Sequence, residues 1–232
     1  MVARPILRDG VVLSRSRIAS DPPSLNTTQY SIEQKPNLSP ITMKKLILAS
    51  TSPRRKEVLE KTGLSFEVVP SDYEEDMTLD LPPEELAEFL SAGKARAVAA
   101  KNPGAVVVAA DTFVVHEHHR LGKPHTNERA KEMLQLLSGK AHYIVTGVTI
   151  ISDTGQVQSF HEKTAVHMAE LSEELIDQYI ATGEPLDKAG AYALQELGAM
   201  LVEKIEGDFF NAMGLPLRRL VHELRAFGVE VF

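Results

Sequence analysis

Residues 46–55 read LILASTSPRR, and this stretch organises the predicted fold because it joins an apolar run to an expected helix. Ser52 is a favourable N-cap, and Pro53 suits the first helical position. Arg54 and Arg55 then fall in the first turn, where the helix dipole favours acidic residues. A bound anion would remove this conflict, because free N–H groups, hydroxyls and guanidiniums together can hold a phosphate. From this stretch alone, a solvated basic helix start is an equal alternative.

The composition indicates a soluble globular protein. The chain has 232 residues, 43% of them hydrophobic, which is enough for one domain or a compact two-lobed unit. No apolar run approaches the roughly 20 residues of a membrane span, so we expect no membrane partner and take the cytoplasm as the default location. The absence of cysteine excludes disulfides and thiolate chemistry. A net charge of -7 argues against a nucleic-acid partner.

The first 42 residues differ in composition from the rest of the chain. They are rich in Ser, Pro, Asn and Thr and have no sustained periodicity, whereas Met43 directly precedes an apolar strand-like run. We expect residues 1–42 to be a disordered leader or an extension from an upstream start, and residues 43–232 to form a single domain. A targeting segment is the alternative, but this stretch contains acidic residues and no clear cleavage site.

From Lys44 onward, strand and helix patterns alternate, which predicts an α/β fold with a mixed sheet and flanking helices. Residues 105–110 are continuously apolar, as is typical of a strand covered on both faces. This run leads into Asp111 and Thr112, and catalytic groups often lie where buried strands end. A structural aspartate that caps a turn is the alternative.

Further polar groups are expected at helix faces and loops. Lys94 shares an i, i+4 row with apolar Leu86 and Leu90, so it faces either the core or a cleft, or it snorkels at the edge of the stripe. Lys123 lies in a rigid GKP turn, and residues 116–119, HEHH, are expected at a solvated hairpin tip rather than in a metal site.

A second dense polar stretch, GEPLDKAGAYALQ, covers residues 183–195 and is too rich in glycine and proline for a helix interior. Its Asp187-Lys188 pair could be a surface ion pair of little energetic value. Together with the cations described above, however, such carboxylates suit a polyphosphate ligand with a divalent ion. The sequence contains no P-loop, dinucleotide fingerprint or zinc-ligand spacing.

Six separate motifs now carry a resemblance that spans residues 44–232. In chain order they are STSPRR (50–55), ADT (110–112), GKP (122–124), LSG (137–139) followed by His142, GEPLDKAG (183–190) and GLP (214–216). This set strongly resembles the Maf family, which acts as nucleoside triphosphate pyrophosphatases. The resemblance implies that residues 43–232 form a Maf-like catalytic domain. It further implies a fold like that of inosine triphosphate pyrophosphatases, with two lobes around a cleft.

The resemblance also implies roles for individual residues. Asp111 would be the general base that activates water for cleavage between the α and β phosphates, which releases a nucleoside monophosphate and pyrophosphate. The triphosphate would be bound by Ser50, Arg55, Lys94, Lys123 and Lys188. Glu75, with Glu74 as the less favoured choice, and Asp187 would organise a divalent cation. Mg²⁺ is expected, and Mn²⁺ or Co²⁺ could substitute for it.

Three positions imply a branch of the family. Arg54, Thr112 and Gln195 match the branch that acts on dTTP and UTP, with modified pyrimidine triphosphates as further substrates. The branch that acts on 7-methyl-GTP would have Trp, Gln and Glu there. Two alternatives stay open: a pyrophosphatase that prefers a purine or modified base, and a nucleotide-sensing regulator of cell division that acts by binding. The sequence also leaves a homodimer open.

Overall fold

The computed structural model describes residues 44–76 and 79–231. The chain separates into two units, Met1–Thr42 and Met43–Phe232, and the structure described below is that of the second unit. The expected leader, residues 1–42, lies outside the described residues. Within the described ranges, no helix is long and apolar enough to cross a membrane.

One mixed sheet forms the centre of this unit. In the described residues it contains seven strands: β1 (Lys45–Ala49), β2 (Glu67–Val68), β3 (Ala105–His116), β4 (His119–Leu121), β5 (Ala141–Ile151), β6 (Val157–Met168) and β7 (Val202–Glu206). Their order is β2-β1-β3-β5-β6-β7, with β4 paired to β3. Strand β1 runs parallel to β2 and β3, and the other pairs are antiparallel. The predicted α/β fold with a mixed sheet is therefore confirmed.

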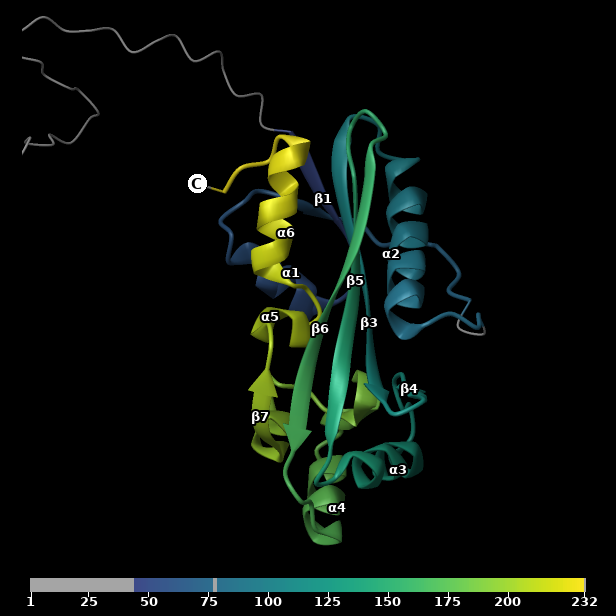
Figure 1. Cartoon of the computed structure of the whole chain (residues 1–232), viewed down its shortest axis with the longest axis vertical. Coiled ribbons are helices and arrows are strands. Elements are labelled where there is room, and N and C mark those ends of the chain that lie inside the picture. The colour runs from purple at the N-terminus through teal and green to yellow at the C-terminus, as the bar shows by residue number, and fades with distance from the viewer. Residues whose placement is uncertain (1–43, 77–78, 232) are drawn as a thin grey trace, which may run out of the picture. The chain divides into compact units, whose positions relative to one another are not determined.

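Helices cover both faces of this sheet. They are α1 (Pro53–Glu60), α2 (Pro83–Ala99), α3 (Asn127–Leu137), α4 (Glu173–Ala181), α5 (Phe209–Ala212) and α6 (Leu217–Leu224). Figure 1 shows α2 on one side of β1, β3 and β5, with α1 and α6 on the other side. Alternate residues of β1 follow this division: Leu46 and Leu48 pack with α1 and α6, whereas Ile47 packs with α2. Burial on both faces explains why these strands are continuously apolar.

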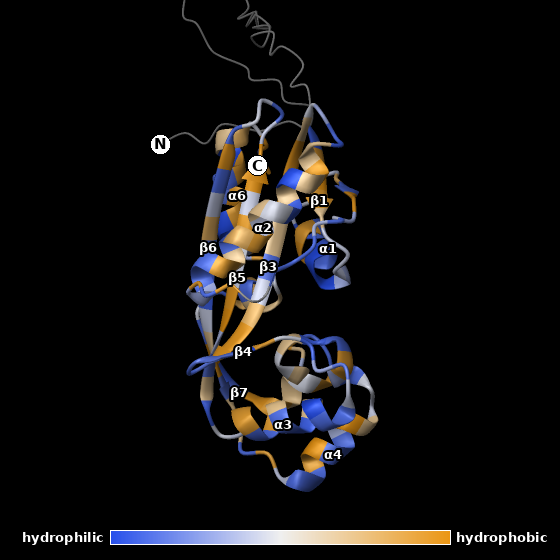
Figure 2. Cartoon of the chain, turned by 90° about the vertical axis from the view of Figure 1, so that its right-hand side faces the viewer, coloured by the Kyte–Doolittle hydropathy of each residue, from blue (hydrophilic) through white to orange (hydrophobic). Residues whose placement is uncertain are grey.

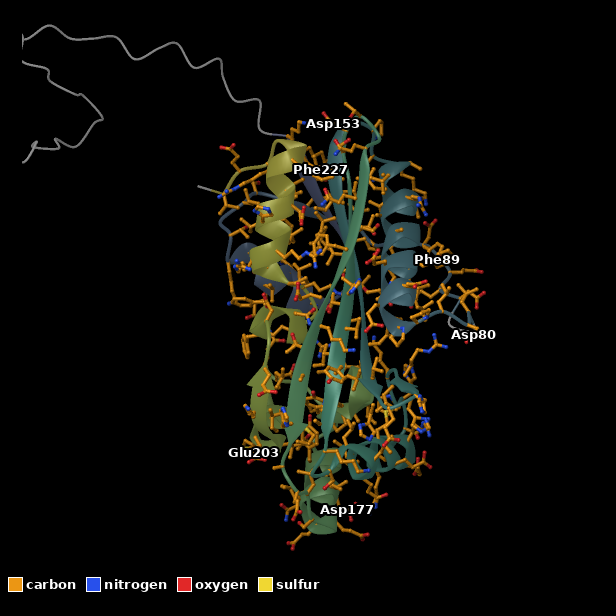
Figure 3. All side chains as sticks on the ribbon, in the orientation of Figure 1. Asp80, Phe89, Asp153, Asp177, Glu203 and Phe227 are labelled. Carbon is orange, nitrogen blue, oxygen red and sulfur yellow. The ribbon has the colours of Figure 1, made fainter. Side chains whose placement is uncertain are left out.

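The long strands β3, β5 and β6 extend beyond these helices into a second lobe, where α3 and α4 lie (Figure 2). A separate apolar cluster there joins Val114 of β3 to Leu134 of α3 and Ile176 of α4. Figure 3 labels Asp153 in the β5–β6 turn and Asp177 on α4, which mark opposite ends of the long strands. The expected two lobes are therefore present, and both are built on the same three strands.

Two details of β3 correct the sequence-based expectations. The strand does not end at Asp111, because β5 pairs with it without interruption from Val107 to Val115. Asp111 therefore lies in the middle of a strand, opposite Gly147. His116 is buried at the end of this strand, and its Nδ1 lies 3.1 Å from the carbonyl oxygen of Ala141. It is not part of the solvated tip expected for residues 116–119.

Local signals determine the entry into α1 and the irregular loop after α4. Ser52 caps α1 by accepting a hydrogen bond from the backbone N–H of Arg55, as predicted.

After α4 the chain forms three short 3₁₀ segments, η1 (Glu184–Asp187), η2 (Ala189–Ala191) and η3 (Leu197–Leu201). A fourth, η4 (Arg225–Phe227), follows α6. Gly183 and Gly190 have φ of 77° and 70°, a region that favours glycine. The sequence did not indicate the short helix α5.

Gly147 allows α2 to approach the sheet closely. A Cβ atom there would lie 2.2 Å from the carbonyl carbon of Ala87 in α2. We expect Gly147→Ala to lower the stability by about 1–3 kcal/mol, because the helix backbone would have to move. Thermal unfolding should show a clearly reduced Tm. Gly122→Ala is the control, because a Cβ there meets no atom within 4 Å. Equal Tm values for both variants would contradict this interpretation.

Candidate active site

A cavity of about 800 Å³ lies beside β3, within the size range typical of small-molecule sites. Its walls contain every predicted site residue: Ser50, Arg54, Arg55, Glu75, Lys94, Asp111, Thr112, Lys123, Asp187, Lys188 and Gln195. Glu74, the less favoured choice, does not line it. The fold therefore brings together groups that are up to 145 residues apart in the chain, since Ser50 and Gln195 line the same cavity.

Asp111 and Lys94 form a buried ion pair in this cavity. The Lys94 ammonium donates to Asp111 Oδ1 and also lies 2.9 Å from Glu75 Oε1. Only 13% of the Lys94 side chain is exposed, so this lysine faces the cleft and does not snorkel into solvent. Asp111 Oδ2 is buried and has no hydrogen-bond partner among the described residues. One carboxylate oxygen is thus fixed by Lys94, and the other is buried without a partner.

The surroundings of Asp111 favour a proton-accepting role. Burial raises the pKa of the Asp111 carboxyl above its usual value of 3.8, whereas the positive charges of Lys94 and Arg55 oppose that rise. A carboxylate with a raised pKa accepts a proton from water more readily than an exposed aspartate does. The geometry and the charge environment therefore both fit a general base.

Arg55 is held rigidly at the cavity wall by three hydrogen bonds. Its Nε donates to the carbonyl oxygen of Gly214 at 2.9 Å, and its Nη2 donates to Thr112 Oγ1 at 2.9 Å. Its Nη1 lies 3.5 Å from Ser50 Oγ. Burial lowers the pKa of Arg55, while the charge of Asp111 opposes this shift. The helix dipole disfavours a guanidinium in the first turn of α1. Hydrogen-bond acceptors elsewhere in the fold nevertheless hold the Arg55 guanidinium there.

Thr112 accepts a hydrogen bond from Arg55 directly and also bonds to Thr146, and the direction of both hydrogen bonds can be assigned. Thr146 donates its one hydroxyl proton to the carbonyl oxygen of Asn211 at 3.2 Å. Thr112 must therefore be the donor in its 3.1 Å hydrogen bond to Thr146. In this arrangement Thr112 accepts from Arg55 and has no proton left for a nucleobase. Its predicted role in base recognition stays a prediction, and its visible role is to position Arg55.

The opposite wall carries a second lysine between two carboxylates. Lys188 is buried, with only 9% of its side chain exposed, and it donates to Asp187 Oδ1 and lies 3.8 Å from Glu196 Oε1. The hydrogen bond from Lys188 lowers the pKa of Asp187. Because the lysine is buried against the cavity, the pair is not the isolated surface ion pair considered from the sequence. Lys123 is exposed at the rim and forms no ion pair with another described residue.

The carboxylates do not form a ready metal cage. In residues 44–76 and 79–231, no group of three or more His, Asp or Glu side chains is arranged to hold a metal ion. Glu75 and Asp187, the predicted metal ligands, are paired with Lys94 and Lys188 respectively. Any cation would therefore need oxygen ligands from the bound substrate as well.

Some residues that shape the site gave no signal in the sequence. Asn211 of α5 is fully buried, and its Nδ2 donates to the carbonyl oxygen of Ile144 at 3.1 Å and to Thr164 Oγ1 at 2.9 Å. It thereby ties the segment that leads to Gly214 onto the sheet. No local pattern distinguishes such an asparagine from one in a surface loop.

The acidic loop that carries Glu75 is seated by Tyr73. The ring of Tyr73 lies directly against Gly93 of α2, where an added Cβ would come within 2.3 Å of it. The next residue, Lys94, contacts Glu75 at 2.9 Å. A helical glycine followed by a lysine on an apolar face could have suggested a close approach here, but the sequence does not identify the partner.

Cations gathered around a buried carboxylate define the class of the site: it is built for an anionic, phosphorylated ligand. The chain belongs to the Maf family, since the model of Maf-like proteins matches residues 45–227. Two relatives named dTTP/UTP pyrophosphatase, from Bacillus cereus and Bacillus anthracis, are 50% and 49% identical to it over 189 residues. Each alignment covers 82% of this chain and 93% or 98% of the relative.

A solved structure described as a HAM1 protein from Coxiella burnetii also aligns with the chain. It is 15% identical, with 79% of this chain and 100% of the other covered, and the TM-score is 0.46. A similarity at this level carries no argument about the site.

Replacement of Lys94 should change the titration of Asp111. We expect Lys94→Met to raise the pKa of the Asp111 carboxyl further, because the variant removes the charge and the hydrogen bond that favour the ionised form. Carboxyl ¹³C NMR titration would measure the pKa directly. Lys45→Met is the control, because Lys45 pairs with the exposed Glu67. An unchanged Asp111 pKa in Lys94→Met would show that the ion pair does not control this carboxyl.

Proposed function

We propose that the protein is a nucleoside triphosphate pyrophosphatase that hydrolyses dTTP and UTP to the nucleoside monophosphate and pyrophosphate. The observation that carries this proposal is Asp111, a buried carboxylate with one oxygen on Lys94 and the other unpartnered in a cavity lined by cations. The relatives named dTTP/UTP pyrophosphatase support the choice of substrates.

In the proposed reaction, Asp111 accepts a proton from a water molecule through its unpartnered Oδ2. The water oxygen forms a bond to the α phosphorus, and the bond between that phosphorus and the oxygen bridging to the β phosphorus breaks. Pyrophosphate leaves with the bridging oxygen. Lys94 keeps the carboxylate oriented and ionised until the proton is transferred. The raised pKa of Asp111 should place the acid limb of the pH–rate profile above the value for an ordinary aspartate.

Cations around the cavity would bind the triphosphate and stabilise the charge that develops on pyrophosphate. Arg55 offers a fixed guanidinium, and Lys123 at the rim and Lys188 on the opposite wall offer ammonium groups. Ser50 is buried next to Arg55 and would add a hydroxyl. Their spread over both walls suits a ligand with several phosphates better than one with a single phosphate.

We further propose Mg²⁺ as the cofactor, with Mn²⁺ or Co²⁺ as substitutes. Mg²⁺ is commonly bound by one or two carboxylates together with substrate phosphates and water, which fits a site that lacks a preformed cage. Glu75 and Asp187 would hold the ion, and each could be released from its lysine as that lysine turns to a phosphate. When bound, the ion supplies additional positive charge at the phosphates.

The Asp111→Asn variant tests the proposed base. We expect kcat on dTTP and UTP to fall by about 10²- to 10⁴-fold, because the amide cannot accept the proton of water. A phosphate-release assay with added inorganic pyrophosphatase, run over a nucleotide panel, measures this change. Asp153→Asn in the β5–β6 turn is the control, since that aspartate pairs with Lys44 and neither residue lines the cavity. Undiminished turnover in Asp111→Asn would refute the assigned role. A wild-type protein inactive on dTTP and UTP with Mg²⁺ or Mn²⁺ would refute the function itself.

Arg54 is proposed to read the nucleobase, separately from the phosphate role of Arg55. Arg54 lines the cavity, and its positive charge contributes to lowering the pKa of Asp187, but no hydrogen bond or ion pair within the described residues holds its guanidinium in place. We expect Arg54→Trp to change the ratio of kcat/KM for UTP to that for GTP by about tenfold or more. The fall in kcat/KM should be larger for UTP than for GTP. Equal reductions on every nucleotide would mean that Arg54 serves the phosphates instead.

A further inference from the structure

Glu57 is a surface residue with 57% of its side chain exposed, and it contacts one of the predicted recognition residues. It is on α1, and its Oε2 accepts a hydrogen bond from Gln195 Nε2 at 3.4 Å. Its other oxygen, Oε1, lies 3.5 Å from the ammonium of Lys61. Glu57 does not line the cavity, whereas Gln195 does. The glutamate is therefore placed to act on a ligand only through the glutamine.

This contact determines which way round the Gln195 amide is held. An ionised carboxylate can only accept hydrogen bonds, so the NH₂ half of the amide must face Glu57. The opposite orientation would bring two oxygen atoms together and is disfavoured. The orientation thus follows from the chemistry of the pair.

The other half of the amide lacks a partner. Gln195 Oε1 is buried and accepts no hydrogen bond from the described residues. A buried acceptor without a donor lowers stability, so a ligand that supplies a donor here gains affinity. The oxygen is covered in the structure, so a base can reach it only if the Gln195 side chain turns toward the cavity that it lines. The carboxylate of Glu57 would continue to favour the amide nitrogen in that movement, because it can only accept.

Nucleobases differ in what they offer to a fixed acceptor. Uracil and thymine carry an N3–H donor between two carbonyl oxygens, whereas cytosine has an unprotonated N3 acceptor next to an amino group. An amide oxygen opposite N3 therefore accepts a hydrogen bond from uracil or thymine, whereas opposite the N3 of cytosine it meets another acceptor. Arg54, which has no acceptor at all, would suit the carbonyl oxygens of the same edge.

We propose that Glu57 is a positioning residue for base selection: by fixing the Gln195 amide, it makes the site favour uracil and thymine over cytosine. This inference rests on the proposed function, because it deepens the base selection of the same cavity. Glu57 itself touches no part of the nucleotide, and its contribution passes entirely through Gln195.

Glu57→Gln tests this role with almost no change in shape. A carboxamide at position 57 can donate as well as accept, so the Gln195 amide could turn over and present its NH₂ group to cytosine N3. We expect the ratio of UTP to CTP in kcat/KM to fall by about three- to tenfold, the value of one hydrogen bond. Inhibition of UTP hydrolysis by CTP gives the same comparison if CTP is turned over too slowly. Glu60→Gln is the control, since this exposed residue of α1 pairs with Lys56 and does not line the cavity.

A double-mutant cycle separates positioning from a general structural effect. In a Gln195→Ala background, Glu57→Gln should leave the UTP to CTP ratio unchanged, because the group through which it acts is gone. A purely destabilising substitution would instead lower Tm and reduce both activities equally. An unchanged ratio in the single variant, or a change that persists without Gln195, would overturn the inference. If the wild-type protein fails to hydrolyse dTTP and UTP, the proposed function falls as well, which is a different and separately visible outcome.

Discussion

The buried pair of Lys94 and Asp111 is the contact on which the arrangement of the site depends. It joins α2 to the middle of β3, and Gly147, opposite Asp111 on β5, lets the backbone of the same helix approach the sheet at Ala87. A charge buried without its partner is costly, so each member of the pair requires the other. The same contact therefore joins the helix to the sheet, orients the proposed base and opposes the rise in its pKa that burial causes.

A buried lysine between two carboxylates occurs twice in the cavity. Lys94 lies between Asp111 and Glu75, and Lys188 lies between Asp187 and Glu196. In the free protein these carboxylates compensate lysines that the fold buries away from water. A polyphosphate would offer the same lysines further acceptors and would free Glu75 and Asp187 for water or a cation, while Lys94 keeps its contact with Asp111. The two buried lysines are thus compensated before a ligand arrives.

The sequence predicted the general fold and the membership of the site, but it did not predict the contacts. Apolar alternation and the run at residues 105–110 indicated a covered mixed sheet, which the structure contains. The same run led to the wrong expectation that the strand ends at Asp111, since the pairing with β5 that continues to Val115 is not visible in β3 itself. His116 was likewise misplaced, because its burial depends on a neighbouring strand.

Local chemistry in the sequence determined the cap at Ser52, the glycine-rich loop after α4 and the residue types that surround the cavity. The motifs also indicated which residues belong to one site. A family resemblance identifies such residues but says nothing about the distances between them. Only the tertiary structure decided that Thr112 holds Arg55, that Asn211 anchors the segment before Gly214, and that Glu57 faces Gln195. These contacts join elements far apart in the chain, and a hydrogen bond between two side chains depends on distance and direction in space, which no local pattern of residues specifies.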